Sequence, residues 1–532
     1  MPIFFIKMIC RCIICPAGMY LAQNERGLVM KNTKRLLYVV LVIFGCGVKW
    51  SWGAERPSYS RYFECDASGA VSVQYSDNIT DTVLRGAVAE WIANGGKYKR
   101  KSGGVSITKL SLINCTKLTS LPDLKKLTEL EELSLQQCRI TSLTLDGPAS
   151  LKSLIFAKCE ELTSLTLSGL AALEYLNLND CNSLANLTLT GLTTLTRLTY
   201  DHCIAFANVS FTGLALKELD FNHDNLTNLT LSLLTNLEKL SISNSSKLTN
   251  LTLNGLKKLN NLNLYGCATL NQLPDLSELT KLTTLNLSGC KTLPQLPGLD
   301  KLISLDYLNL AGCKALLKLP DLRTLTKLAT LDLSDTSFVG LTLYGLPALT
   351  KLSLNGCERL INLTLSGLAK LTELYLNRCT SLINLTLSGL DMLSTLGIES
   401  VMALQRVALR GLKELSKLLL YNRKQLTSLT LSGLTSLKTL ELKGCATLTK
   451  LPNLDKFRQL ETVNLEETCL PEAVRKNATT KSDVQKLLKE LESKNCFYTP
   501  LEEALYLLRD RLLDLAGVLS RPAASRLVPT TA

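Results

Sequence analysis

LAKLTELYLNRCTSLINLTLSG occupies residues 368–389, and its pattern of Leu, Cys and Gly returns along most of the chain. The neighbouring stretch 346–367, LPALTKLSLNGCERLINLTLSG, and the distant stretch 170–191, LAALEYLNLNDCNSLANLTLTG, match it position by position. From residue 104 to residue 477 the pattern recurs every 20 to 23 residues, in about seventeen units of which the first and last are degraded. Such a period predicts a repeat solenoid.

The alternation of residues within one unit predicts its path. In Leu374-Tyr375-Leu376 the two Leu side chains point to one face of a strand and Tyr375 points to the other. One coil cannot bury its own Leu row, so the coils should stack into a parallel sheet over a continuous Leu core. We call the surface of this sheet the concave wall, the usual name for it in such solenoids.

The second half of the unit forms the opposite side, which we call the convex wall. The segment LTLSG at 385–389 alternates and predicts a short strand or extended segment instead of a helix. Five units carry Leu-Pro there and should turn without ladder hydrogen bonds, because Pro fixes φ and lacks an N–H. A convex side without helices predicts shallow curvature. The Leu-Pro pairs lie at 121–122, 273–274, 296–297, 319–320 and 451–452.

Over residues 104–477 the spacing LxxLxLxxCxxL resembles that of the leucine-rich repeat superfamily, with Cys where Asn is more common. Units such as LTTLNLSGCKTLPQLPGLDK, residues 282–301, are similar to repeats of plant resistance receptors and trypanosome surface-associated proteins. The doubled LxL units are similar to those of bacterial secreted proteins. The resemblance implies binding of a protein or peptide and leaves the ligand unidentified.

Eleven of the eighteen cysteines share one repeat position. Their Cβ atoms should all point the same way into the core, which suits a row of buried thiols that donate weakly to neighbouring carbonyls better than disulfides or metal ligands. These residues are Cys115, Cys138, Cys159, Cys181, Cys203, Cys267, Cys290, Cys313, Cys357, Cys379 and Cys445.

Other units depart from this row. Asp224, Ser245 and Thr336 take the position in three units and should form local polar contacts. Val401 and Arg423 break the row in adjacent units, so residues 390–433 are the expected weak point of the array. Outside the row, Cys469 and Cys496 are the pair for which we consider a disulfide.

The regions outside the array read as a targeting region and two caps. Residues 1–54 are the targeting region, and 30–54 has the basic run, apolar run and small residues of a secretory signal peptide. Met30 is then the expected start of the protein. The alternative is that the chain starts at Met1 and that residues 2–21 form a first hydrophobic element. Residues 55–103 should form an N-terminal cap with a helix over 80–96, and 478–532 a C-terminal helical cap and tail.

A signal peptide predicts a secreted or cell-surface protein. If the signal stays uncleaved, this N-terminal segment is the only part expected to contact a membrane. The alternative is a cytoplasmic adaptor or regulatory subunit in which residues 1–54 are not a signal. In the C-terminal cap, helices are expected at 483–493 and 500–516. Ser482 with Gln485 and Thr499 with Glu502 have the spacing of capping boxes.

The candidate binding residues are the Tyr and Asn that alternate with core Leu on the concave wall. Tyr offers a large contact area with a polar end and Asn offers adaptable hydrogen bonds, although such residues also occur on strand surfaces that bind nothing. The partner would be a protein or peptide, or a glycan. The residues are Tyr175, Asn177, Asn179, Asn261, Asn263, Tyr265, Asn286, Tyr307, Asn309, Tyr375, Asn377 and Tyr421.

The two histidines of the chain give a second, weaker hypothesis. His202 and His223 take equivalent positions in consecutive coils, with Asp201 and Asp224 beside them. Four such groups could bind a divalent metal ion. An ordinary surface pair in an irregular unit is the favoured interpretation.

Composition argues against several classes of protein. Only two His residues leave little material for His-based catalysis, no catalytic order of side chains is persuasive, and we expect a protein that is not an enzyme and needs no cofactor. Nearly half of the net charge of +13 lies in residues 1–54. The rest is spread thinly over the chain, so nucleic acid is not an expected partner.

Overall fold

The computed structural model describes residues 59–73, 76–100, 103–203, 211, 214–222, 226–231, 234–499, 501–502, 505 and 508. The chain divides into two units, Met1–Pro57 and Ser58–Ala532, and every described residue belongs to the second. The predicted targeting region 1–54 therefore lies outside the described residues. Within the described part, no helix is both long enough and apolar enough to cross a membrane.

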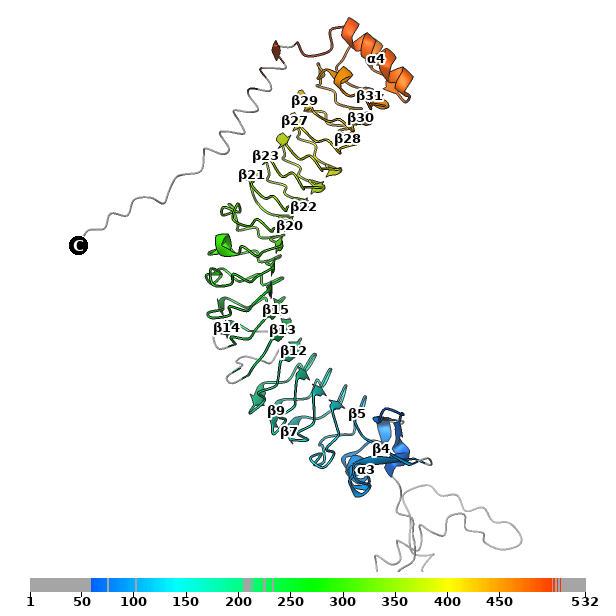
Figure 1. Cartoon of the computed structure of the whole chain (residues 1–532), viewed down its shortest axis with the longest axis vertical. Helices are drawn as coiled ribbons and strands as arrows, with labels where there is room; N and C mark the ends of the chain where they lie inside the picture. The colour runs from blue at the N-terminus through cyan, green and yellow to red at the C-terminus, as the bar shows by residue number, and fades with distance from the viewer. Residues whose placement is uncertain are drawn as a thin grey trace, which may run out of the picture. The chain divides into compact units, whose positions relative to one another are not determined.

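The concave wall is a sheet of 16 strands followed by one of four strands. The first sheet begins with the antiparallel pair β1 (Phe63–Cys65) and β2 (Ala70–Val73) and continues with parallel strands in chain order (Figure 1). These are β5 (Lys109–Ser111), β6 (Glu132–Ser134), β8 (Ser153–Ile155), β10 (Tyr175–Asn177), β12 (Arg197–Asp201), β13 (Glu218–Asn222), β15 (Lys239–Ser243), β17 (Asn261–Asn263), β18 (Thr284–Asn286), β19 (Tyr307–Asn309), β20 (Thr330–Asp332), β22 (Lys351–Ser353), β24 (Glu373–Tyr375) and β26 (Thr395–Gly397). The second sheet holds β28 (Lys417–Leu419), β30 (Thr439–Glu441), β31 (Thr462–Asn464) and the antiparallel β32 (Asn477–Ala478).

The convex wall consists of strands wherever the unit reads LTL, as predicted, and of turns where it reads Leu-Pro. All the pairs in its three sheets are parallel. The sheets are β7 (Ser142–Asp146), β9 (Ser164–Ser168) and β11 (Asn186–Leu189); β14 (Asn228–Thr230) and β16 (Asn250–Thr252); and β21 (Gly340–Tyr344), β23 (Asn362–Ser366), β25 (Asn384–Ser388), β27 (Arg406–Arg410) and β29 (Ser428–Ser432). Two Leu-Pro coils instead carry the short 3-10 helices η3 (Leu299–Lys301) and η4 (Leu454–Lys456).

One continuous aliphatic core fills the space between the walls. Leu262, Leu285 and Leu308 pair in register on neighbouring strands, and all three are completely buried. Burying a leucine contributes about 1.5–3 kcal/mol, so repetition of this row over the array supplies the stability that a single coil lacks.

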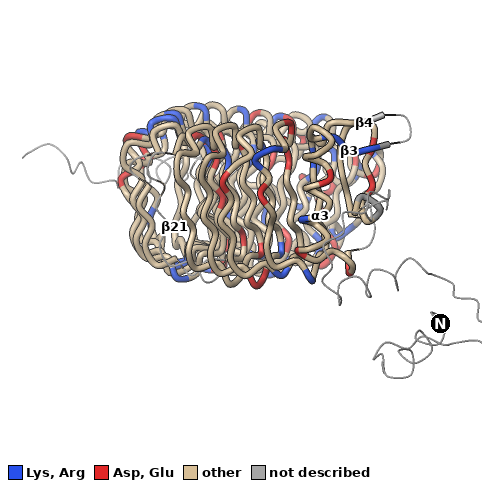
Figure 2. The backbone as a smooth tube through the Cα atoms, turned by 90° about the horizontal axis from the view of Figure 1, so that it is seen from below, with Lys and Arg blue, Asp and Glu red and all other residues tan. Residues whose placement is uncertain are grey.

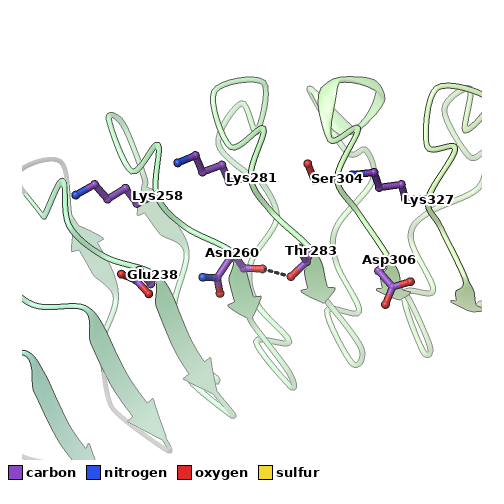
Figure 3. Close-up of a pocket in the computed structure, with 8 residues that line it drawn as sticks. All are labelled: Glu238, Lys258, Asn260, Lys281, Thr283, Ser304, Asp306 and Lys327. Carbon is purple, nitrogen blue, oxygen red and sulfur yellow. Dashed lines mark hydrogen bonds between the residues drawn. The ribbon is translucent and has the colours of Figure 1, made fainter.

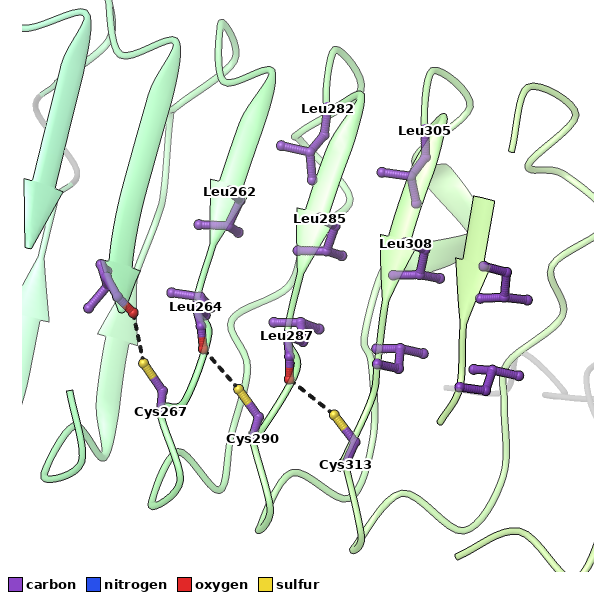
Figure 4. Close-up of a cluster of buried hydrophobic side chains, with 14 of the residues drawn as sticks. Leu262, Leu264, Cys267, Leu282, Leu285, Leu287, Cys290, Leu305, Leu308 and Cys313 are labelled. Atoms are coloured by element: carbon purple, nitrogen blue, oxygen red, sulfur yellow. Dashed lines mark hydrogen bonds between the residues drawn. The ribbon is translucent and has the colours of Figure 1, made fainter. Parts of the chain in front are cut away.

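The cysteine row is a ladder of hydrogen bonds, as predicted. The Cys290 thiol donates to the carbonyl oxygen of Leu264 in the preceding coil at 3.2 Å, and Cys313 does the same to Leu287 (Figure 4). Equivalent bonds run from Cys138, Cys159, Cys181, Cys203, Cys267, Cys357, Cys379 and Cys445. Each thiol therefore joins its coil to a carbonyl of the preceding coil, and several of these carbonyls also accept a backbone N–H of their own turn.

The disulfide considered between Cys469 and Cys496 is not formed, and the polar replacements in the cysteine row differ in their bonding. Cys469 is exposed and free, and Cys496 is buried and free, with its carbonyl accepting a hydrogen bond from Leu451 N. Ser245 is buried, but its hydroxyl has no hydrogen-bond partner. Thr336 does bond locally, to the carbonyl of Leu333 at 2.7 Å. Asp224 lies outside the described residues.

The N-terminal cap is built around α3 (Asp81–Ala93), whose Thr80 N-cap accepts a hydrogen bond from Val83 N. Trp91 is completely buried and meets the Phe63 ring edge-on at 5.2 Å. The cap also contains η1 (Tyr59–Tyr62), η2 (Ser76–Asn78) and the hairpin β3 (Lys97–Arg100) and β4 (Gly103–Ser106).

Asp81 fastens this cap to the first coil. Its carboxylate accepts four hydrogen bonds from the backbone and hydroxyl groups of Thr119 and Ser120, at 2.7–3.1 Å. Partial burial raises the pKa of Asp81, but these bonds outweigh it and lower the pKa to about 2.

The first helix of the C-terminal cap starts two residues earlier than expected. Helix α4 (Lys481–Ser493) has Thr480 as its N-cap, so the pair Ser482 and Gln485 is not its capping box. Thr480 and Asp483 bond reciprocally instead. The capping box of Thr499 and Glu502 is present, since Glu502 accepts from Thr499 N and Thr499 Oγ1 accepts from Glu502 N. Beyond the short 3-10 helix η5 (Glu472–Val474), α4 buries Val484, Leu487 and Leu491.

The cysteine ladder predicts a site-specific loss of stability. Cys290→Ala removes the thiol that joins the carbonyl of Leu264 to the next coil, which leaves that carbonyl only the N–H of Cys267, and it removes a buried sulfur. It should therefore lower the free energy of unfolding by about 1–3 kcal/mol. Cys469→Ala, at an exposed free cysteine, should change it by less than about 0.5 kcal/mol. Urea unfolding of the two variants checks this, and equal losses would contradict the ladder.

The cap predicts a pH-dependent difference. The lowered pKa of Asp81 means that the ionised carboxylate stabilises the folded state above about pH 4, and that this contribution disappears as the pH falls through about 2. Asp81→Asn should therefore melt below the wild type at pH 6, and the two melting temperatures should converge near pH 2. A constant difference across this range would count against the carboxylate.

Candidate binding face

The concave wall presents its predicted Tyr and Asn residues outward, because each alternates with a buried Leu. Leu176 is completely buried, while its neighbours Tyr175 and Asn177 are half-buried. Two of the predicted residues project furthest: Tyr265 is 48% exposed and Tyr421 is 42% exposed. The others, all half-buried, are Asn179, Asn261, Asn263, Asn286, Tyr307, Asn309, Tyr375 and Asn377.

Most of these asparagines hold the backbone, a role that the sequence did not reveal. Four accept a hydrogen bond at Oδ1 from the N–H two residues further on, and two accept one from the next coil. The former are Asn177 (2.9 Å), Asn263 (3.1 Å), Asn286 (3.0 Å) and Asn309 (2.9 Å), and the latter are Asn179 (3.0 Å) and Asn377 (2.8 Å). Their carbonyl ends are therefore engaged in the fold, and Asn177, Asn263 and Asn309 also donate from Nδ2 to hydroxyl groups of the wall.

The tyrosines differ in how firmly the wall holds them. Arg197 lies 5.3 Å from the ring centroid of Tyr175, and Lys351 lies 5.5 Å from that of Tyr375. Asn309 Nδ2 donates to the Tyr307 hydroxyl at 3.2 Å. A ring held this way loses little conformational freedom when it contacts a partner, which favours its use in recognition.

Charged side chains join neighbouring coils on the same wall. Lys109 pairs with Glu132 at 2.6 Å, and Glu218 lies between Arg197 and Lys239, at 3.3 and 2.6 Å. Figure 2 shows Lys and Arg interspersed with Asp and Glu on the side of the array in view. Exposed pairs of this kind contribute at most about 1 kcal/mol each, so their main effect is to balance the charge of the wall.

The proposed histidine cluster is only partly described. His202 is one of the residues with a positive φ, 61°, and its Nδ1 lies 3.1 Å from Asp180 Oδ1. Burial, with the nearby Asp220 carboxylate, raises the pKa of Asp201 to about 6, and His202 opposes the shift. His223 and Asp224 lie outside the described residues. Among the residues that are described, no group of three potential ligands could hold a metal ion.

A groove of about 630 Å³ borders the concave wall where the chain enters β17, β18 and β19. Three lysines take the position before the second Leu of their coils, and polar residues take the position after it (Figure 3). This groove was not predicted from the sequence, because its residues lie just before the strands and the predicted binding residues lie on them or just after them. The lining residues are Lys258, Lys281, Ser304 and Lys327 in one row, and Glu238, Asn260, Thr283 and Asp306 in the other.

The charged side chains of the groove form fewer ion pairs with neighbouring coils than those of the concave wall. Lys258 Nζ donates to Asn236 Oδ1 at 2.7 Å, and Thr283 Oγ1 donates to the carbonyl of Asn260 at 2.9 Å. Ion pairs between neighbouring coils are common elsewhere in the described array, but none joins these lysines to Glu238 or Asp306. The groove is therefore open to a polar ligand whose charges could pair with both rows.

The concave ladder is interrupted within residues 390–433, where the sequence predicted a weak point. β26 ends the 16-stranded sheet and β28 begins the next sheet. Arg423, in the cysteine position, is only 2% exposed and donates from Nη2 to the carbonyl of Ile398 at 2.5 Å. Burial lowers the pKa of this guanidinium from its ordinary value.

Comparison with known proteins gives one family match and several structural likenesses. Residues 100–207 and 179–294 match the BspA type leucine rich repeat region, with six copies. No curated protein matches the chain.

Three solved structures illustrate the likeness. The functional domain of InlJ from Listeria monocytogenes, which includes a cysteine ladder, is 21% identical, with 79% of this chain and 77% of that chain covered and a TM-score of 0.36. YopM from Yersinia enterocolitica is 19% identical, with 73% and 85% covered and a TM-score of 0.35. A leucine-rich repeat protein from Bacteroides ovatus is 14% identical, with 77% and 97% covered and a TM-score of 0.33.

The repeat spacing, the stacked parallel strands and the family match over residues 100–294 agree with one another. The chain is a leucine-rich repeat protein, and its residues 100–294 are similar to the BspA type of repeat region.

Proposed function

We propose that this chain is an exported repeat protein, not an enzyme, that binds a protein or glycan partner through its concave wall. The observation that carries the proposal is the row of outward Tyr and Asn side chains fixed on an in-register sheet. Tyr265 projects from a coil whose Leu262 and Leu264 are completely buried. Contact groups are thus repeated at about 4.8 Å along a rigid support, which suits recognition of an extended surface.

The coils around β17, β18 and β19 are the best-supported centre of this surface. Tyr265 and Tyr307 lie in these coils, and the groove borders the same strands, since Asn260 directly precedes Asn261. Aromatic contact area and a polar groove are therefore continuous there. Aromatic residues are frequent among those that dominate binding energy, and the mixed charges of the groove support a partner with polar or charged groups, protein or glycan.

Export is supported by the sequence of residues 30–54. Lys31, Lys34 and Arg35 precede the apolar run 36–48, and small residues follow it. This order is that of a secretory signal peptide. A protein bearing it would act in the secreted or cell-surface compartment, where an open wall can meet a partner directly.

The proposal predicts that binding depends on one wall. The double variant Tyr265→Ala, Tyr307→Ala should weaken binding to ligands found on a glycan array and a panel of purified cell-surface proteins by about tenfold or more, because each ring contributes about 1–2 kcal/mol of contact. Tyr344→Ala is the matched control, since Tyr344 ends strand β21 of the convex wall.

Binding constants from biolayer interferometry with the full chain decide the matter. The proposal requires the control to bind like the wild type. Equal loss in both variants, or a wild type that binds none of the probes, would exclude the concave wall as the binding surface.

Export predicts a specific mature terminus. Protein purified from its native host should begin near residue 55, because a signal peptidase cuts after small residues such as Ser51, Gly53 and Ala54. Edman sequencing or N-terminal mass spectrometry reads the terminus. Mature protein that begins at Met1 or Met30 would favour the cytoplasmic alternative.

A further inference from the structure

The coils 390–411 and 412–433 are joined by paired strands on the convex wall but not on the concave wall. We call this missing strand pairing on the concave wall the opening. On the convex wall, β27 and β29 stay paired, with Val407 opposite Leu429 and Leu409 opposite Leu431. On the concave wall, β26 and β28 belong to different sheets. Two strand edges therefore face each other there without a ladder.

Arg423 accounts for this opening. Most coils of the array carry a cysteine at this repeat position, whose thiol is small. The arginine side chain is far longer and must lie between the coils. Its Nη2 reaches the carbonyl of Ile398, the same acceptor that a ladder thiol would use. Gly397, between Leu396 and Ile398, contributes no side chain that could pack across the gap.

The buried guanidinium has no counter-charge in the part of the chain that the structure describes. No carboxylate of the described residues lies within ion-pair distance of Arg423, and its Nε has no hydrogen-bond acceptor. Its Nη1 meets only the thioether sulfur of Met402, at 3.6 Å, and the Tyr421 ring centroid lies 5.8 Å from its central carbon. Thioether sulfur is a weak acceptor, and a buried charge without a partner is costly.

Apolar side chains surround this guanidinium at the surface. Met402 is 53% exposed, Leu419 is 43% exposed and Tyr421 is 42% exposed. Met402 and Tyr421 both contact the guanidinium of Arg423 directly. Methionine adapts its shape readily to different apolar partners. The site thus combines one unsatisfied cation with an adaptable apolar rim.

We infer that this opening is a docking site for a segment of a protein partner in which Asp or Glu is flanked by apolar residues. The carboxylate accepts from Nη1 and Nε of Arg423 in place of the Met402 sulfur, and the flanking residues contact Met402, Leu419 and Tyr421. The inference rests on the proposed function, because it names the chemistry of a partner at one part of the concave wall.

The composition of the rim favours a peptide over an acidic glycan. A sugar acid would need polar groups for its hydroxyls, whereas the exposed Met402, Leu419 and Tyr421 offer apolar and aromatic surface in the two coils at the opening, beside the polar Asn422 and Lys424. Arginine and carboxylate also form a charge-assisted pair of high directional specificity. Arg423 breaks the repeat pattern by replacing the usual cysteine, at a cost in stability. Such a departure is typical of a functional position.

Paired peptides test the inference with the full chain. The probes are immobilised 12-residue peptides with a Phe-Glu-Leu core in varied flanks, each beside a twin in which Gln replaces Glu. The wild type should bind the Glu peptides about tenfold more tightly, the difference expected for a hydrogen-bonded charge. Arg423→Cys, which restores the residue of the ladder, should remove this preference.

Two controls separate binding from folding. Arg423→Cys should unfold at a temperature equal to or above that of the wild type, since Cys occupies this position in other coils. Arg378→Gln removes an exposed arginine two coils earlier and should keep the preference for Glu.

A wild type without preference for Glu, or an Arg423→Cys variant that retains it, overturns the inference. Tighter binding to an oligogalacturonate than to every Glu peptide overturns the peptide assignment. The proposed function fails separately, through the Tyr265 and Tyr307 variant, because those residues lie in other coils.

Discussion

A single coil of this chain cannot bury its own leucines, and the rest of the structure follows from that constraint. Stacking puts Leu262, Leu285 and Leu308 in register, so the residues that alternate with them must point outward. The concave wall is therefore a consequence of the core. Any side chain placed between two core leucines becomes available to a partner, which lets the surface vary while the fold is kept.

Buried backbone groups impose the second constraint. The thiol ladder supplies donors to carbonyls between coils, and the asparagines of the wall accept from N–H groups that turns leave unpaired. Both devices are short side chains that fit the coil spacing. Arg423 satisfies the same carbonyl with a side chain that does not fit, and the concave ladder is interrupted beside it.

Much of this could be predicted from the sequence because periodicity reports burial directly. The parallel strands, the Leu-Pro turns and the thiol ladder all follow from which residue recurs at which position. What could not be predicted depends on contacts between coils: the backbone bonds of Asn177 and Asn377 and the groove beside Lys281. The weak point within 390–433 was predicted, but not that only the concave pairing, between β26 and β28, is lost there. The start of α4 was misplaced because Thr480 and Ser482 both suit an N-cap, and only packing chooses between them.

The central claim is that one in-register stack supports the concave wall and is interrupted at a single place among its described strands. Amide hydrogen exchange of the full chain, read residue by residue, tests it most directly. The account predicts slow exchange for the strand amides of β17, β18 and β19 and markedly faster exchange at Ile398 and Leu419. Uniform protection across the array, or fast exchange at Leu285 and Leu308, would contradict it.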